Sequence, residues 1–302
     1  MQENRCGNKL GQKWVGRLIS VFLVLTMLLG IMPVSVFAAQ DSDTLSDIPG
    51  IGTIENQQSG SLSDFYNVED TTTLSDDTAT STVPNIVDGA YQIGTAAELK
   101  WFASAVNDGT AETQNAVLTA NIDLNNVEWK PIGTTRKKYT GTFNGQNNRV
   151  TGLYISTPDL MAGLFGFADT GSKIENLTVA GNISISNFNQ PTKSCMIGGI
   201  VAVSRGDIIK CHNEVNISLT DYACKTLNVG GICGSIGLNG TVNSIVGCTN
   251  VGDISCSVNP GSTDHFAYAG GIAGRLNFNP KVDSCKNTGS VSVALTGFGT
   301  GC

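Results

Sequence analysis

Three stretches in the last third of the chain share one pattern: CHNEVNIS at 211–218, CTNVGDIS at 248–255 and CKNTGSVS at 285–292. Each begins with Cys, carries Asn two residues later and ends with Ser. A fourth stretch, LTVAGNIS at 177–184, has Leu in place of Cys, and the four begin 34, 37 and 37 residues apart. A repeat of this length cannot bury its apolar side alone, so the pattern predicts coils stacked into a solenoid.

A glycine-rich opening precedes each of these stretches. The four openings are GLFGFADTG (163–171), GIVAVSRG (199–206), GICGSIGLNG (231–240) and GIAGRLNF (271–278). Apolar and polar residues alternate in NISIS (182–186) and DISCS (253–257), as expected for strands with one face inward. We therefore predict an all-β fold, a β-solenoid of the parallel β-helix kind, with four repeats over 163–302. The last repeat stops where another GGI is expected, which indicates truncation at the C-terminus.

The cysteines occupy columns of the repeat that otherwise hold apolar residues. Cys233 aligns with Phe165, Val201 and Ala273, for example. Buried free thiols, disulfides and a metal site are the three alternatives, and the apolar columns favour buried thiols because free Cys packs as a small hydrophobe. Close Cys pairs of the zinc-binding kind are absent from the sequence. The predicted core ladder is Leu177, Cys211, Cys248 and Cys285.

The asparagines form a second column. Repeated side-chain amides can donate and accept hydrogen bonds between neighbouring coils, and Asn suits tight turns. We predict that this column, in which the first copy has Val179, is a structural ladder at a turn, made of Asn213, Asn250 and Asn287.

The segment before the repeats contains one helical pattern. In TAAELKWFASAVNDG (95–109), Thr95 and Glu98 have the spacing of a capping box, and Leu99, Phe102 and Val106 share one face. We predict a helix over about 95–107 that caps the solenoid, within an N-terminal cap and first coils spanning 84–162.

The beginning of the chain has a different composition. A basic start and an apolar run that ends near Ala38 predict a signal peptide over 1–38. Residues 39–83 hold nine acidic residues and no Lys or Arg, which predicts a disordered acidic Ser/Thr-rich spacer. From Pro84 onward there are 15 acidic and 14 basic residues, so no basic excess favours nucleic acid as a partner. No membrane span is expected in the mature chain.

The chain resembles a known family. DGAYQIGTAAELKWFASAVN, YTGTFNGQNNRVTGLYI, AGLFGF and the later GGI repeats are similar to bacterial surface proteins that carry the GLUG motif. The resemblance covers about 88–302. It implies a β-helical repeat region on a secreted or wall-attached protein, often adhesive, and no shared catalytic residues. The expected location is therefore extracellular, with cell-wall association in the full-length protein.

Three functions remain open at this point. The first is a non-catalytic adhesin or scaffold that binds extracellular polysaccharide or a host or neighbour-cell protein, with Tyr222, Phe266 and Tyr268 as candidate stacking residues in inter-repeat loops. The second is a polysaccharide lyase or hydrolase, although no acidic row follows any face; Asp264–His265 and His212 are the isolated acid–base candidates. The third is a mechanical stalk. We expect no catalytic residues, no cofactor and no metal.

Overall fold

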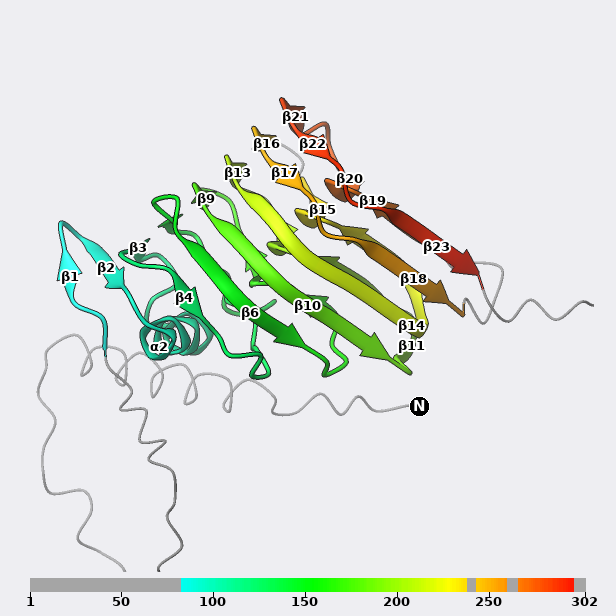
Figure 1. The fold of residues 1–302 in the computed structure, drawn as a ribbon, viewed down its shortest axis with the longest axis horizontal. Helices are drawn as coiled ribbons and strands as arrows, with labels where there is room; N and C mark the ends of the chain where they lie inside the picture. Colours follow the sequence, from blue (N-terminus) through cyan, green and yellow to red (C-terminus); the bar gives the residue numbers. More distant parts are fainter. Residues whose placement is uncertain (1–82, 238–242, 260–265, 296–302) are drawn as a thin grey trace, which may run out of the picture. The chain divides into compact units, whose positions relative to one another are not determined.

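The computed structural model describes residues 83–237, 243–259 and 266–295, and these form a parallel β-solenoid. The predicted signal peptide, the spacer, Asp264–His265 and Cys302 lie outside the described residues. Figure 1 shows the strands stacked side by side in chain order, from β1 at one end to β21–β23 at the other. Each coil contributes a strand to successive sheets and then returns to the first, so the predicted all-β fold is confirmed.

The first sheet has eight described strands and begins each coil. Only its first pair, β1 and β2, is antiparallel among the described strand pairs. The members are β1 (Ile86–Val87), β2 (Ala90–Ile93), β3 (Asn115–Leu118), β5 (Thr142–Asn144), β9 (Lys173–Glu175), β13 (Asp207–Ile209), β16 (Ser244–Val246) and β21 (Lys281–Asp283).

The second sheet has eleven described strands and bends where the long strand β14 passes from one part to the other. The first part contains β4 (Ile122–Asp123), β6 (Arg149–Ile155), β10 (Thr178–Ser186), β14 (His212–Gly230), β17 (Thr249–Asn250), β18 (Ile254–Val258), β22 (Lys286–Asn287) and β23 (Val291–Leu295). The second part pairs β14 with β7 (Met161–Ala162), β11 (Asn189–Gly198) and β19 (Phe266–Gly270). The third, four-stranded sheet is β8 (Phe165–Ala168), β12 (Val201–Ser204), β15 (Cys233–Ile236) and β20 (Ala273–Leu276).

The register of the strands follows the columns of the sequence repeat. Phe165, Val201, Cys233 and Ala273 are successive partners in the third sheet. In the second sheet the partners include Ser184, Ser218, Ser255 and Ser292. Each coil therefore repeats the residue pattern of the one before it, and some of the length differences between coils are absorbed as register shifts within the paired strands, as between Gln190 and Ser194.

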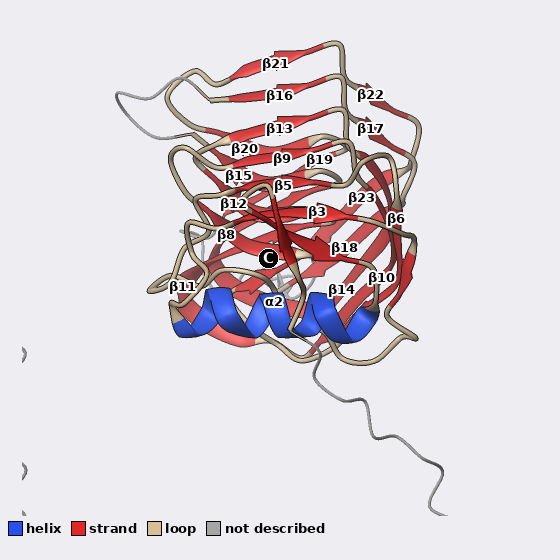
Figure 2. Ribbon diagram, turned by 90° about the vertical axis from the view of Figure 1, so that its left-hand side faces the viewer, coloured by secondary structure: helices blue, strands red, loops and turns tan. Residues whose placement is uncertain are grey.

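One helix closes the N-terminal end of the stack. Helix α2 (Ala96–Asp108) begins after Thr95, whose side chain accepts a hydrogen bond from the Glu98 N–H in a complete capping box, and ends at Gly109 in the left-handed conformation. Its buried residues, among them Leu99 and Phe102, join the solenoid core. Figure 2 shows the helix lying across this end of the strands. The predicted capping helix is confirmed.

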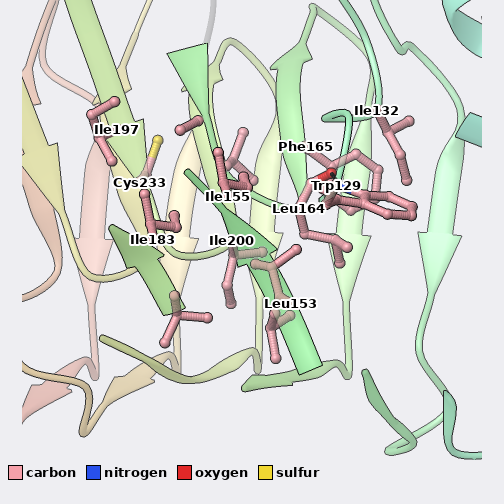
Figure 3. Close-up of a cluster of buried hydrophobic side chains, with 14 of the residues drawn as sticks. Trp129, Ile132, Leu153, Ile155, Leu164, Phe165, Ile183, Ile197, Ile200 and Cys233 are labelled. Carbon is pink, nitrogen blue, oxygen red and sulfur yellow. Dashed lines mark hydrogen bonds between the residues drawn. The ribbon is translucent and has the colours of Figure 1, made fainter. Parts of the chain in front are cut away.

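The core changes along the stack. Near the helix it contains aromatic rings, with Phe102, Tyr139, Phe143 and Phe165 linked by centroid distances of 5.1–6.1 Å. Farther along it consists mainly of Ile, Val, Leu and Cys, with one stacked aromatic pair, Phe188 and Tyr222, and Figure 3 shows Cys233 among Ile183 and Ile197. Within the described residues, no helix is long and apolar enough to cross a membrane.

Candidate binding surface

Two exposed aromatic rings stack on the outer face of β19. Phe266 and Tyr268 lie two residues apart, so both side chains leave the same face of the strand. Their centroids are 6.4 Å apart with an angle of 19° between the ring planes. The two residues are 55% and 41% exposed, respectively. Large aromatic rings are normally buried, so a stacked and exposed pair is a surface ready to bind another apolar face.

A cation lies beside this pair. The guanidinium of Arg275, on β20, is 5.6 Å from the centre of the Tyr268 ring, within the range of a cation–π contact. On the preceding coil its strand partner is Ser235, whose hydroxyl accepts a hydrogen bond from the Asn277 amide at 2.9 Å. Because a guanidinium carries several N–H groups, Arg275 places hydrogen-bond donors at the edge of the aromatic surface. We call Phe266, Tyr268 and Arg275 the aromatic platform.

Polar side chains continue the platform onto the preceding coil. Thr226 and Asn228 of β14 are the strand partners of Phe266 and Tyr268. Asn228 is 3% exposed, and among the described residues its Oδ1 has no hydrogen-bond partner. The buried Asn228 amide lies beneath the surface, so what the outer face offers is two ring faces, the Arg275 guanidinium and the half-buried Thr226 hydroxyl, a mixture suited to a ligand with both apolar and hydroxyl-bearing faces.

The third aromatic candidate, Tyr222, is not part of this surface, and its prediction as a loop residue was wrong. Tyr222 lies inside β14, is fully buried and stacks on Phe188 with centroids 4.4 Å apart. Its hydroxyl donates to the backbone oxygen of Asp159 at 3.0 Å, and burial raises its pKa. The stretch LTDYACKTL (219–227) contains no Gly, Pro or Asn, which was the sequence signal for a continuous strand.

The cysteine ladder lies in the core. Cys211 and Cys248 are each 1% exposed and Cys285 is half-buried; all three are free thiols. The Cys248 sulfur accepts a hydrogen bond from the backbone N–H of Cys211 at 3.4 Å and donates to backbone oxygens of its own and the previous coil. Burial raises the pKa of the Cys211 thiol. The ladder is structural, and within the described residues no group of His, Cys, Asp and Glu is arranged to hold a metal ion.

The asparagine ladder runs through the interior beside it. The Asn213 amide donates to the Asn250 oxygen, and the Asn250 amide donates to the Asn287 oxygen, both at 2.7 Å. Each amide also bonds a backbone oxygen two residues along its own coil. A Cβ atom at Gly231 would lie 2.3 Å from the Asn250 side chain, so the second glycine of this GG pair leaves room for the ladder. The predicted ladder is present, but its placement at a turn was wrong, because Asn213, Asn250 and Asn287 lie in the paired strands β14, β17 and β22.

The described acid–base candidate, His212, belongs to an ionic cluster on the outer face of the second sheet. Its Nε2 is 3.2 Å from the Glu214 carboxylate, which Arg149 also binds through two hydrogen bonds of 2.6 and 2.9 Å. The hydrogen bond from Arg149 holds the pKa of Glu214 below its usual value. Glu214 therefore stays ionised and neutralised by its neighbours, which suits a surface ion pair rather than a proton donor.

Comparisons with known proteins reach only parts of much longer chains. Residues of this chain are 33% identical over 95 positions to a protein of Evansella cellulosilytica named as a Gly-rich membrane protein, covering 30% of this chain and 11% of that one. A second match, 27% identical over 198 positions, is to halomucin of Haloquadratum walsbyi and covers 61% of this chain and 2% of halomucin. No family model and no solved structure matches. The GLUG resemblance therefore stays a prediction.

Proposed function

We propose that this chain is a non-catalytic repeat protein of the extracellular space that binds polysaccharide through the outer surface of its solenoid, as an adhesin or scaffold. The aromatic platform carries the proposal. The two stacked rings offer an apolar surface to the C–H face of a sugar ring, while Arg275 can donate hydrogen bonds to hydroxyl or carboxylate groups at its edge.

The location is part of the proposal. The predicted signal peptide and acidic spacer support secretion, and the names of the two relatives, a Gly-rich membrane protein and halomucin, agree with a place at the cell surface. Wall association and membership of the GLUG-motif proteins belong to the same proposal. A regular solenoid suits this role because its stacked coils present a long, continuous surface to an extended polymer.

Affinity gel electrophoresis of the full chain tests the proposal, with a series of neutral and acidic polysaccharides cast in the gel. We expect at least one polymer to retard the chain, and we expect Phe266→Ala and Tyr268→Ala each to weaken binding about tenfold through loss of ring contact. Phe278→Asn is the matched control, because it removes another exposed ring (61% exposed) and Asn tolerates the φ of 58° at that position.

The same samples separate the other two functions. Release of reducing ends or unsaturated products from the polymers would support the lyase or hydrolase and contradict the non-catalytic proposal. Unretarded migration in every gel would favour the mechanical stalk. Equal retardation of the wild type and both platform variants would show that the polymer binds to another surface of the chain and not to Phe266 and Tyr268.

A further inference from the structure

A hollow lies at the opposite end of the described coils from the aromatic platform, beside the capping helix. It has a volume of about 400 Å³ and lies between the segment 128–135 and the segment 155–161. Its apolar lining comes from Trp129, Pro131, Ile155, Leu160 and Met161. A volume of this size is in the usual range for small-ligand pockets.

The walls of the hollow are fixed by hydrogen bonds. The Trp129 indole donates to the Leu164 oxygen at 3.0 Å, and Figure 3 shows these two side chains next to each other. Asn107, at the end of helix α2, donates to the Pro131 oxygen at 3.0 Å and accepts from the Gly133 N–H at 2.8 Å. The helix thus holds the segment 128–135 at both of these points, so the hollow exists before any ligand enters.

Glu128 fastens the other wall. Its carboxylate accepts hydrogen bonds from the backbone N–H groups of Ser156 and Thr157 at 3.0 Å and from the Ser156 hydroxyl at 2.7 Å. Partial burial raises the pKa of Glu128, but the hydrogen bonds from Thr157 and Ser156 outweigh burial and leave the pKa below its usual value. The carboxylate is therefore ionised and holds Ser156 and Thr157 in place. Other residues of the rim supply the polar groups that are free to contact a ligand.

The rim carries groups of both charges and hydroxyls. Lys130, Thr134, Thr135 and Asp159 line the opening, and Lys130 and Asp159 are exposed. The lining holds the Lys130 ammonium and the Asp159 and Glu128 carboxylates, so it has no positive excess that would favour an anion, and Glu128 is already bonded to Ser156 and Thr157. An apolar floor under such a rim fits an uncharged molecule with one apolar face and several hydroxyl groups at its edge, and a pyranose sugar has this form.

A neighbouring hollow extends the site along the helix. Its volume is about 380 Å³, and it shares Trp129 and Lys130 with the first hollow while adding Lys100, Ser104 and Asp108 from α2. The two hollows share the segment 128–130 as a common wall, so they are near enough for neighbouring sugar rings of one short chain to contact both. We propose that this pair of hollows is a second binding site, which takes a short neutral oligosaccharide. The inference rests on the proposed function only in taking the ligand to be a glycan.

Titration calorimetry of the full chain tests this proposal with neutral di- to tetrasaccharides of glucose, mannose, galactose and N-acetylglucosamine. We expect at least one of them to bind. We expect Thr135→Trp, which adds a bulky ring at an exposed lining position, to weaken that binding at least tenfold. Thr135→Ser, which keeps the hydroxyl, is the matched control, and unchanged thermal unfolding of both variants verifies the fold.

The outcomes separate the two proposals. Absence of binding to every oligosaccharide, or equal binding by Thr135→Trp and the wild type, overturns the second site whatever the polymer gels show. Loss of oligosaccharide binding in Thr135→Trp but not in Tyr268→Ala supports it. Loss of polymer retardation in Tyr268→Ala alone bears on the aromatic platform, because Tyr268 lines neither hollow.

Discussion

The two ends of the described solenoid are built on different principles. The end at residues 83–162 is closed by a helix and packed with aromatic rings that occur once each, such as Phe102 and Phe143. The repeats from 163 onward are held by residues that recur at the same position in successive coils, such as Asn213 and Asn250. The repeats contain one unrepeated aromatic pair, Phe188 and Tyr222, so unrepeated packing dominates at the capped end and repeated packing dominates along the stack.

The largest expected effect concerns the capping end. Phe102 is fully buried and lies 5.8, 5.9 and 6.1 Å from the rings of Tyr91, Tyr139 and Phe143. Phe102→Ala removes a ring from a site that cannot collapse around the loss, so we expect the free energy of unfolding to fall by about 3–5 kcal/mol. Guanidinium unfolding measures this change.

Two optical probes sharpen the test. The described tryptophans, Trp101 and Trp129, both lie at the capping end, so their fluorescence follows that end, whereas circular dichroism follows all the coils. We expect the fluorescence midpoint of Phe102→Ala to fall further than the dichroism midpoint. Phe266→Ala is the control, because it removes an exposed ring of the same type. A loss of less than 1 kcal/mol in Phe102→Ala would contradict unique aromatic packing at the cap.

The next effect concerns the repeats. Asn250 occupies the middle of the ladder, accepting from Asn213 and donating to Asn287 and to the Gly252 oxygen. Asn250→Val leaves polar groups unpaired on both neighbouring coils. A fully unpaired buried group costs about 1–3 kcal/mol, but the Asn213 amide keeps its bond to the Val215 oxygen and Asn287 is exposed, so we expect a total loss of about 2–4 kcal/mol.

Asn213→Val is the matched variant for this prediction. Its neighbour on the preceding coil is Val179, so the substitution shortens the ladder from its end instead of interrupting it. We expect the loss in Asn213→Val to be about half of that in Asn250→Val, measured by the same unfolding experiment. Equal losses in the two variants would mean that the asparagines act singly, and the ladder would then have no cooperative part in stacking the coils.

The difference between unrepeated and repeated packing also decides which features of the structure the sequence predicts. Repeated positions can be compared with one another, so the columns of Cys233 and Asn250 predict both burial and strand register. The helix was predicted because Thr95 and Glu98 form a local capping box. The hollow beside Trp129 was missed because its walls come from three unrepeated segments, and nothing in their composition indicates that they meet. Tyr222 was misplaced because a long strand was taken for a loop.

A further effect is absent at neutral pH and appears only in alkaline solution. Burial raises the pKa of the Cys233 and Cys256 thiols to about 12, from 9.0 for an ordinary thiol. Below pH 9 both the folded and the unfolded thiols are protonated, and the stability is unaffected. Between pH 9 and about 12 only the unfolded thiols ionise, so the free energy of unfolding falls by about 1.4 kcal/mol per pH unit for each thiol.

Substitution of both thiols isolates this effect from other groups that titrate in the same range. Val201 is the strand partner of Cys233, and Val293 is that of Cys256, so the double variant Cys233→Val, Cys256→Val uses residues already found in these columns. We expect its unfolding free energy to decline less steeply between pH 9 and 11 than that of the wild type. Parallel declines would show that these thiols reach solvent in the folded protein.

The smallest effect concerns the cysteine ladder itself, where Leu177 already stands in the column of Cys248. Cys248→Val keeps a buried apolar side chain of similar size, so we expect the free energy of unfolding to fall by less than about 1.5 kcal/mol.

The ladder cysteines are stacked in register on neighbouring coils, because the residues that follow them, His212, Thr249 and Lys286, are strand partners. Neighbouring parallel strands lie about 4.8 Å apart, whereas a disulfide needs Cβ atoms about 3.8 Å apart. We therefore expect all three thiols to remain free even in oxidising medium, and mass spectrometry after alkylation of protein unfolded without reductant checks this. A peptide pair joined through Cys211 and Cys248 would show instead that the coils move together to form a covalent link, and the repeats would then owe part of their stability to crosslinks rather than to repeated packing alone.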